Sequence, residues 1–268
     1  MTRYVCTMNV QVFEASPNSS LGGIFGPLSG SEFQTPNMYI TLENAASLES
    51  HRRERNTAVL LRLDGEQLVE VQRIDLMERS RSLPSSFALG HAAESVCCAV
   101  WGSERLHELV RADIGEQIVF KQISKWHSMP SNMYAIAGFE AAGERRLAVS
   151  CFDNSLRVFH WGRLGPLELS RLQRTADFWL PTAIASLPDC DLLIVANGKN
   201  SAGGEWQTAL ELFNGDASGS FSGPRRLLPA DSALYIWTML LYRNPVDGRL
   251  QTVLYDGNSR CLKSFDFV

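Results

Sequence analysis

The chain has little of what marks a membrane protein, a secreted protein or a nucleic-acid binder. No run approaches the roughly 20 apolar residues that a membrane-spanning helix needs. The 268 residues carry a net charge of only -4, which gives no general attraction to nucleic acid or to an anionic membrane. The N-terminus lacks a continuous apolar core and a small-residue cleavage site, so no signal peptide is predicted.

Paired cysteines are also lacking. The chain has 6 cysteines, and apart from Cys97-Cys98 they are scattered singly, without C-x-x-C spacing. This pattern is typical of small buried residues in strands of a reduced protein. It predicts a cytoplasmic location.

Linear motifs for catalysis are absent as well. None of the 5 histidines has a partner at metal-ligand spacing, and neither a G-x-S-x-G elbow nor a phosphate-binding loop occurs. Asp153-Asn154 and Asp189-Cys-Asp191 are turn residues rather than a calcium loop. The sequence therefore predicts no catalytic residue, no metal site and no cofactor.

What the chain does have is an internal copy. Gly65-Glu-Gln-Leu-Val69 returns as Gly115-Glu-Gln-Ile-Val119, within segments of alternating apolar residues. Each copy predicts two short strands around a turn, with glycine where the chain reverses.

Prolines keep a similar period, since they recur about every 49 residues along the chain. A short apolar run follows each one, such as Met38–Leu42 and Met133–Ile136. Proline can open a strand because its missing N–H needs no ladder partner there, so we interpret these runs as the first strand, a, of each unit. The prolines in question are Pro36, Pro84, Pro130, Pro181 and Pro229.

Four short strands, a to d, per unit of about 40–50 residues form a propeller blade. The sequence thus predicts an all-β fold: a single β-propeller over residues 1–268, built of about six four-stranded units. The unit boundaries are 1–35, 36–83, 84–129, 130–180, 181–228 and 229–268. The first unit lacks strand a and the last lacks strand d, so we expect the N-terminal segment to complete the last blade, or the chain to be part of a longer propeller. A β-sandwich is the alternative.

Two repeat families resemble parts of the chain. Asp153-Asn-Ser-Leu-Arg-Val-Phe-His-Trp161 is similar to the end of a WD repeat. Leu63-Asp-Gly65, Leu68–Ile74 and Leu193–Asn197 resemble the EPTP (EAR, epitempin-like) repeat. The second resemblance implies an adhesion or ligand-binding module outside the cell. Neither resemblance brings a catalytic residue.

In a four-stranded blade, the d–a and b–c connections emerge on the same face. Here they combine arginine and tryptophan, a pairing enriched at interaction hot spots. The candidate partner-binding residues are Arg52, Arg53, Arg55, Arg79, Arg81, Trp126, His127, Arg174, Trp179 and Trp206. Trp126 and Trp179 have an alternative role in packing between blades.

These patterns predict an interaction scaffold for a protein or peptide partner that is partly anionic; nucleic acid and membranes are not expected partners. One alternative is an extracellular EPTP-like propeller. Another is a propeller enzyme or lectin with a composite site at the ring axis. The predicted a strands, which would line that axis, are mainly apolar or tyrosine, and this favours a non-catalytic role.

Overall fold

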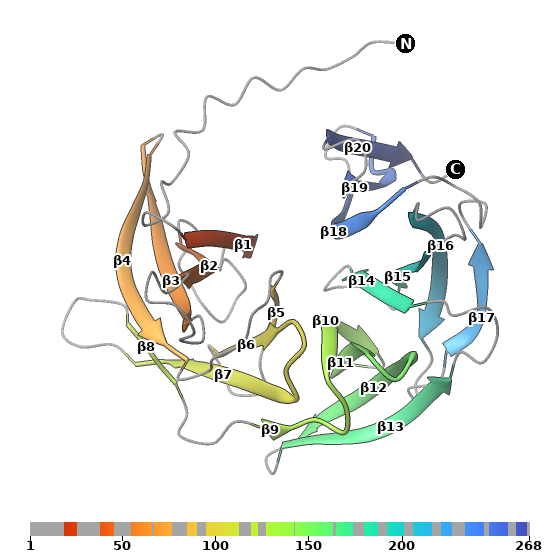
Figure 1. Cartoon of the computed structure of the whole chain (residues 1–268), viewed down its shortest axis with the longest axis horizontal. Helices are drawn as coiled ribbons and strands as arrows, with labels where there is room; N and C mark the ends of the chain where they lie inside the picture. Colours follow the sequence, from red (N-terminus) through yellow and green to blue (C-terminus); the bar gives the residue numbers. More distant parts are fainter. Residues whose placement is uncertain are drawn as a thin grey trace. The chain divides into compact units, whose positions relative to one another are not determined.

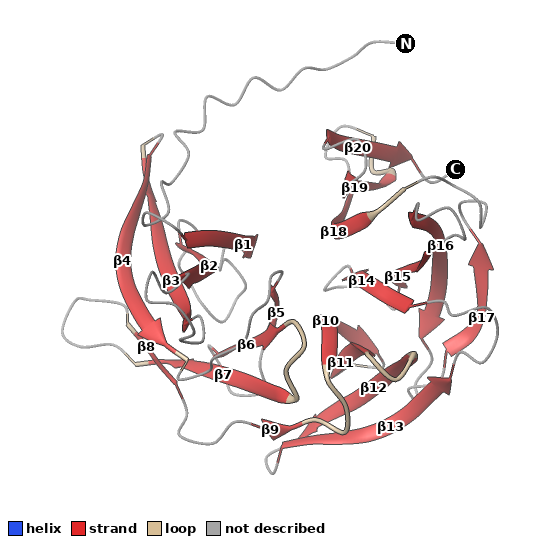
Figure 2. Ribbon diagram, in the orientation of Figure 1, coloured by secondary structure: helices blue, strands red, loops and turns tan. Residues whose placement is uncertain are grey.

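Short runs of alternating apolar and polar residues between turns build the whole described part of the molecule as β-strands (Figure 2). The computed structural model describes residues 19–25, 38–45, 55–65, 67–76, 85–89, 95–112, 119–122, 127–141, 143–162, 165–173, 180–186, 192–200, 206–215, 221–226, 234–243, 247–256 and 261–266. Within these ranges no helix is long and apolar enough to span a membrane. The chain divides into two compact units, residues 1–83 with 112–121, and residues 84–111 with 122–268.

The first unit is one antiparallel sheet with strand order β1-β2-β3-β4. Its strands are β1 (Ser19–Phe25), β2 (Met38–Ala45), β3 (Arg55–Asp64) and β4 (Gln67–Asp75). The repeated glycine, Gly65, makes the turn between β3 and β4 with a φ of 61°, a conformation that glycine adopts without steric cost. The side-chain amide of Gln72 on β4 makes two hydrogen bonds with the backbone of Phe120. It donates to the Phe120 carbonyl and accepts from the Phe120 N–H, both at 2.8 Å.

One strand assignment was wrong in this unit. Met38–Leu42 was predicted to be the first strand of a blade, but β2 is the second strand, paired with β1 on one side and β3 on the other. The first strand, Ser19–Phe25, is rich in serine and glycine and follows none of the five periodic prolines. The proline period therefore did not predict it. The predicted strand Gly23–Leu28 overlaps only its end.

The second unit contains four successive antiparallel sheets, which we call blades (Figure 1). In the first of them β5, β6 and β7 pair in sequence and β9 pairs with β7. The others are β10 to β13, β14 to β17, and β18 to β20. The bounds are β5 (Ser85–Leu89), β6 (Ser95–Val100), β7 (Arg105–Arg111), β8 (Phe120–Gln122), β9 (His127–Ser128), β10 (Met133–Ala141), β11 (Glu144–Cys151), β12 (Ser155–Gly162), β13 (Gly165–Gln173), β14 (Leu180–Ser186), β15 (Leu192–Asn200), β16 (Trp206–Gly215), β17 (Phe221–Arg226), β18 (Ile236–Arg243), β19 (Leu250–Asp256) and β20 (Cys261–Asp266).

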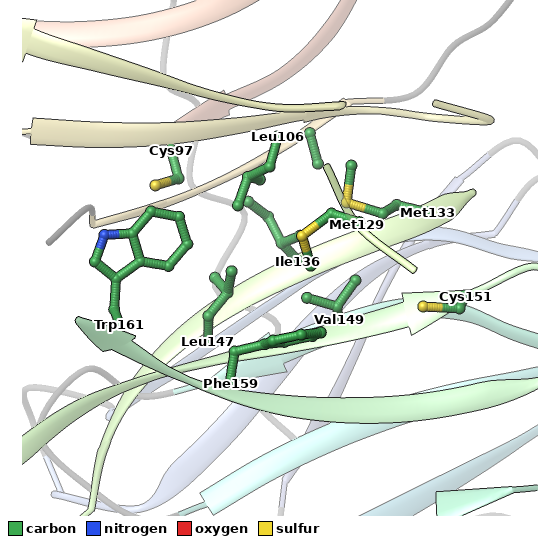
Figure 3. Packing of buried hydrophobic residues seen from close by; sticks show 11 residues of the cluster. Cys97, Leu106, Met129, Met133, Ile136, Leu147, Val149, Cys151, Phe159 and Trp161 are labelled. Carbon is green, nitrogen blue, oxygen red and sulfur yellow. The ribbon is translucent and has the colours of Figure 1, made fainter. Parts of the chain in front are cut away.

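The first strands of these blades lie side by side: β10 contacts β5 and β14, and β14 contacts β18. Buried side chains fill the space between neighbouring blades. Figure 3 shows the cluster between the β5–β7 and β10–β13 blades, where Cys97 and Leu106 face Leu147, Phe159 and Trp161. Burying such apolar surface is the main favourable term in the stability of the fold.

In all, the described residues form five sheets. Residues 1–18, where the sequence placed most of a further unit, lie outside the described residues. The prediction of one domain with the boundaries given above stays a prediction.

Candidate functional site

Three aromatic side chains gather where β10 begins. Trp101 follows β6, Tyr134 is the second residue of β10, and Phe152 follows β11. The Tyr134 and Phe152 rings stack with centroids 4.1 Å apart and an interplanar angle of 25°. Trp101 meets Phe152 edge-on at 5.0 Å and lies 6.1 Å from Tyr134. All three are partly exposed, and we call them the aromatic site.

Two of the rings occupy equivalent positions in neighbouring blades. Ala99 pairs with Leu106 as Ser150 pairs with Leu156, and Trp101 and Phe152 each come two residues after the first member of these pairs. In the next blade, where Ala196 pairs with Leu210, the equivalent residue is Gly198. Gly198 lies within β15 opposite Thr208, so of these three equivalent positions only those of Trp101 and Phe152 lie in turns and carry an aromatic ring.

A β-bulge positions the third ring. The register of β10 against β11 shifts between Met133 and Ala135, so Tyr134 is the extra residue. The same shift occurs in the first strands of the next two blades, between Pro181 and Ala183 and between Ile236 and Thr238. Bulges redirect a side chain out of the regular alternation and are common beside functional sites.

Backbone hydrogen bonds hold both aromatic turns against the start of β10. The N–H of Gly102 donates to the Met133 carbonyl at 2.8 Å, and the Met133 N–H donates to the Ser103 carbonyl at 2.9 Å. From the other side, the Phe152 N–H donates to the Asn132 carbonyl at 2.8 Å. Because these groups bond to one another, the site is preformed and its backbone is satisfied.

An ion-pair network supports the turn that carries Phe152. Asp153 accepts hydrogen bonds from the Ser155 hydroxyl at 2.5 Å and from Arg157 at 2.6 Å, and Arg171 lies 3.1 Å away. Arg157 is buried and also donates to Glu168 at 2.7 Å. Burial alone would raise the pKa of the Asp153 carboxyl, but the hydrogen bonds from Ser155 and Arg157 and the charge of Arg157 hold it below its usual value.

The tyrosines of this face are neutral. Burial raises the pKa of the Tyr134 hydroxyl above its ordinary value, and the proximity of Tyr235 raises it further. Burial likewise raises the pKa of Tyr235, which directly precedes β18. No hydrogen bond to the Tyr134 hydroxyl is present among the residues that the structure describes, so this group can donate to a ligand.

Of the candidate residues from the sequence, His127 is the one whose side chain is described. It packs edge-on against Trp161 at 5.2 Å, with Nε2 3.6 Å from a carboxylate oxygen of Glu108. A Cβ on Gly165 would stand 2.8 Å from its Nδ1. The other oxygen of Glu108 accepts from Ser95 at 2.6 Å. His127 thus lies in the packing between two blades.

The remaining candidates are not brought together by the described residues. Arg55 and Trp206 begin β3 and β16, and nothing further is described of their side chains. The others, namely Arg52, Arg53, Arg79, Arg81, Trp126, Arg174 and Trp179, lie outside the described residues. Their role in partner binding stays a prediction.

Sequence reasoning missed the aromatic site, since none of its three residues was among the candidates. Tyr134 was predicted only as part of the first strand Met133–Ile136, and Trp101 and Phe152 were given no role in binding. The recurrence of Asn37-Met-Tyr39 as Asn132-Met-Tyr134 does not mark the site, because Tyr39 lies in the second strand of its sheet whereas Tyr134 lies in the first strand of its blade. Within the described ranges, no group of three or more His, Cys, Asp or Glu side chains is arranged to hold a metal ion.

Comparisons with known proteins identify the fold. The sequence matches no protein-family model and no curated protein sequence. The structure is similar to Sqt1 from Chaetomium thermophilum, with a TM-score of 0.56 and 11% identity over 92% of this chain and 72% of that chain. A second structure of that protein, bound to the N-terminus of the ribosomal protein L10, aligns with the same TM-score and identity over 92% of this chain and 75% of that chain.

The structure is also similar to a glucose dehydrogenase, with a TM-score of 0.55 and 12% identity over 92% of this chain and 83% of that chain. These neighbours are β-propellers.

The fold is therefore an all-β propeller, as the repeat predicted. At such low identity the likeness extends to the fold alone, and a propeller hosts both binding proteins and enzymes. The resemblance to WD and EPTP repeats stays a prediction at the level of family.

Proposed function

We propose that this propeller is an interaction scaffold that binds an extended peptide segment of a protein partner at the aromatic site. The observation that carries the proposal is the preformed group of Trp101, Tyr134 and Phe152 at the b–c turns. Tryptophan and tyrosine are enriched at binding hot spots because they bury a large rigid surface at little entropic cost. The hydrogen-bonded turns beneath them reduce the cost of ordering on binding.

The placement of the site supports the same function. Trp101 and Phe152 both lie in turns between the second and third strands of neighbouring blades, and loops on a rigid scaffold carry binding more often than strands do. The structural neighbour Sqt1, which was solved with a peptide segment of a ribosomal protein, supports the proposal that a propeller of this kind can bind a chain terminus.

An unbiased peptide selection tests the proposal. The full chain is immobilised and used to select from a random phage-displayed peptide library, with the Tyr134→Ala variant as a parallel target. We expect sequences that are enriched on the unaltered protein and lost on Tyr134→Ala, because that change removes the ring that stacks on Phe152.

Leu167→Ala is the matched control. Leu167 is 64% exposed and lies opposite His160, at the other end of the same blade, so its loss should leave the selected sequences bound. Equal binding to the unaltered protein and to Tyr134→Ala would contradict the proposal. A thermal melt of each variant verifies that it is folded.

A further inference from the structure

We propose that the aromatic site accepts a proline-rich segment in the polyproline II conformation. This inference rests on the proposed function and names the class of peptide. The groups that the site can offer to a ligand are aromatic rings and a hydroxyl, in contrast to the N–H groups and arginines that already have partners within the protein.

Three N–H groups of the site are already engaged and are not available for strand addition. That mode needs a row of free N–H and carbonyl groups that can pair with an incoming strand. Here the N–H groups of Gly102, Met133 and Phe152 donate to carbonyls of the same face. Side chains therefore supply the recognition.

Charge recognition does not fit these side chains. Binding of a phosphorylated or acidic peptide needs arginines that are free to pair with it. In the part of the site that the structure describes, Arg157 pairs with Asp153 and Glu168, and Arg171 pairs with Asp153. At the Tyr134 hydroxyl, the neighbouring titratable group among the described residues that raises the pKa is another phenol, Tyr235.

Rings and a hydroxyl donor are what polyproline recognition uses. Proline side chains pack against aromatic faces in aromatic-lined sites, and the preformed helix loses little entropy on binding. That helix has no internal hydrogen bonds, so its carbonyls need donors from the protein. The three rings provide the faces, and the protonated hydroxyl of Tyr134 provides a donor beside them.

The extent of the site agrees with this ligand. The three ring centroids lie within 6.1 Å of one another, so the rings form one small patch. An amphipathic helix would need a longer apolar groove to contact its i, i+3, i+4 and i+7 residues.

Calorimetry with defined peptides tests the inference on the full chain. The probes are a synthetic decaproline, a glycine-serine decapeptide and an oligoarginine of equal length. We expect decaproline to bind and the glycine-serine peptide not to bind. Tyr134→Ala should weaken decaproline binding by about tenfold or more, since aromatic packing and one hydrogen bond together exceed the 1.4 kcal/mol that tenfold represents.

Two further variants sharpen the test. Tyr134→Phe keeps the ring and removes the hydroxyl, and should weaken binding about two- to tenfold, the value of one neutral hydrogen bond. Leu167→Ala should bind decaproline as the unaltered protein does.

The outcomes separate this inference from the proposed function. If the library yields Tyr134-dependent peptides without proline, or if oligoarginine binds there and decaproline does not, the inference is overturned and the proposed function stands. If neither the library nor the probes give Tyr134-dependent binding, both are overturned.

Discussion

Two blades of the second unit place a cation at the same position and neutralise it in different ways. Arg157 and Lys263 each follow a leucine that pairs with the end of the preceding strand, Leu156 with Ser150 and Leu262 with Tyr255. In the β10–β13 blade the partner is Asp153, which lies in the turn and is 31% exposed. In the β18–β20 blade it is Asp256, the last residue of β19, which is 1% exposed.

The difference determines what each turn can present. With its acid in the turn, the β10–β13 blade has Cys151 at the strand end, where it joins the core, and Phe152 follows as a member of the aromatic site. In the β18–β20 blade the acid itself takes the strand end and is buried, and Gly257 follows it in the sequence. One repeated ion pair thus lies beneath an aromatic turn in one blade and forms a buried contact at the strand end in the other.

The largest effect is expected from removing the buried acid. Asp256 accepts from Lys263 at 2.7 Å and from the Tyr235 N–H at 2.9 Å. Asp256→Ala leaves both donors without this acceptor and should lower the free energy of unfolding by about 3 kcal/mol. Urea denaturation measures this loss.

Asp256→Asn is the informative companion, because it keeps an acceptor for the Tyr235 N–H and loses only the charge. It should therefore cost less than Asp256→Ala. Lys263 is 33% exposed. If Asp256→Ala lowers the free energy of unfolding no more than a change at an exposed residue does, the Lys263 ammonium is hydrated by water in that variant, and the prediction is wrong.

A smaller loss in the free energy of unfolding, on the order of 1 kcal/mol, is expected when the charge of Asp153 is removed. Asp153 is partly exposed, so water screens its pairing with Arg157. The pKa of Asp153 is lowered in the folded protein, so its contribution is present above the unfolded value of about 4 and is lost as the pH falls through the folded value. Asp153→Asn should remove part of the fall in stability below about pH 4. Chemical denaturation from pH 7 to pH 3 compares the two proteins, and identical slopes would contradict the assignment.

The strands of these blades could be predicted from the sequence, because their alternation and turn residues are local signals. The match of Leu156-Arg-Val-Phe159 with Leu262-Lys-Ser-Phe265 even placed the two cations in register. The aromatic site could not be predicted in the same way. Met133-Tyr-Ala-Ile136 alternates like a regular strand, and only the pairing with β11 reveals the bulge that redirects Tyr134. The approach of Trp101 to Phe152 depends on two blades packing together, which no local pattern encodes.

The smallest effect is expected at the turn itself, where the two aromatic turns differ. Both are closed by equivalent hydrogen bonds, from the Ser103 N–H to the Val100 carbonyl and from the Asn154 N–H to the Cys151 carbonyl, each at 3.1 Å. The first turn reaches positive φ with Gly102 at 75°, whereas the second does so with Asn154 at 62°. Among the described residues, the Asn154 side-chain oxygen is buried without a hydrogen-bond partner.

Asn154→Gly should therefore raise the free energy of unfolding by about 0.5 kcal/mol, since glycine accepts this φ and the buried acceptor is removed. Asn154→Ala should lower it by about 1 kcal/mol because alanine is strained there. Thermal and urea unfolding measure both, and the sign of the difference is the test. If Asn154→Gly destabilises the protein while peptide binding is unchanged, the asparagine side chain contributes to the turn through a contact that glycine cannot replace, and the two turns are less alike than their hydrogen bonds indicate.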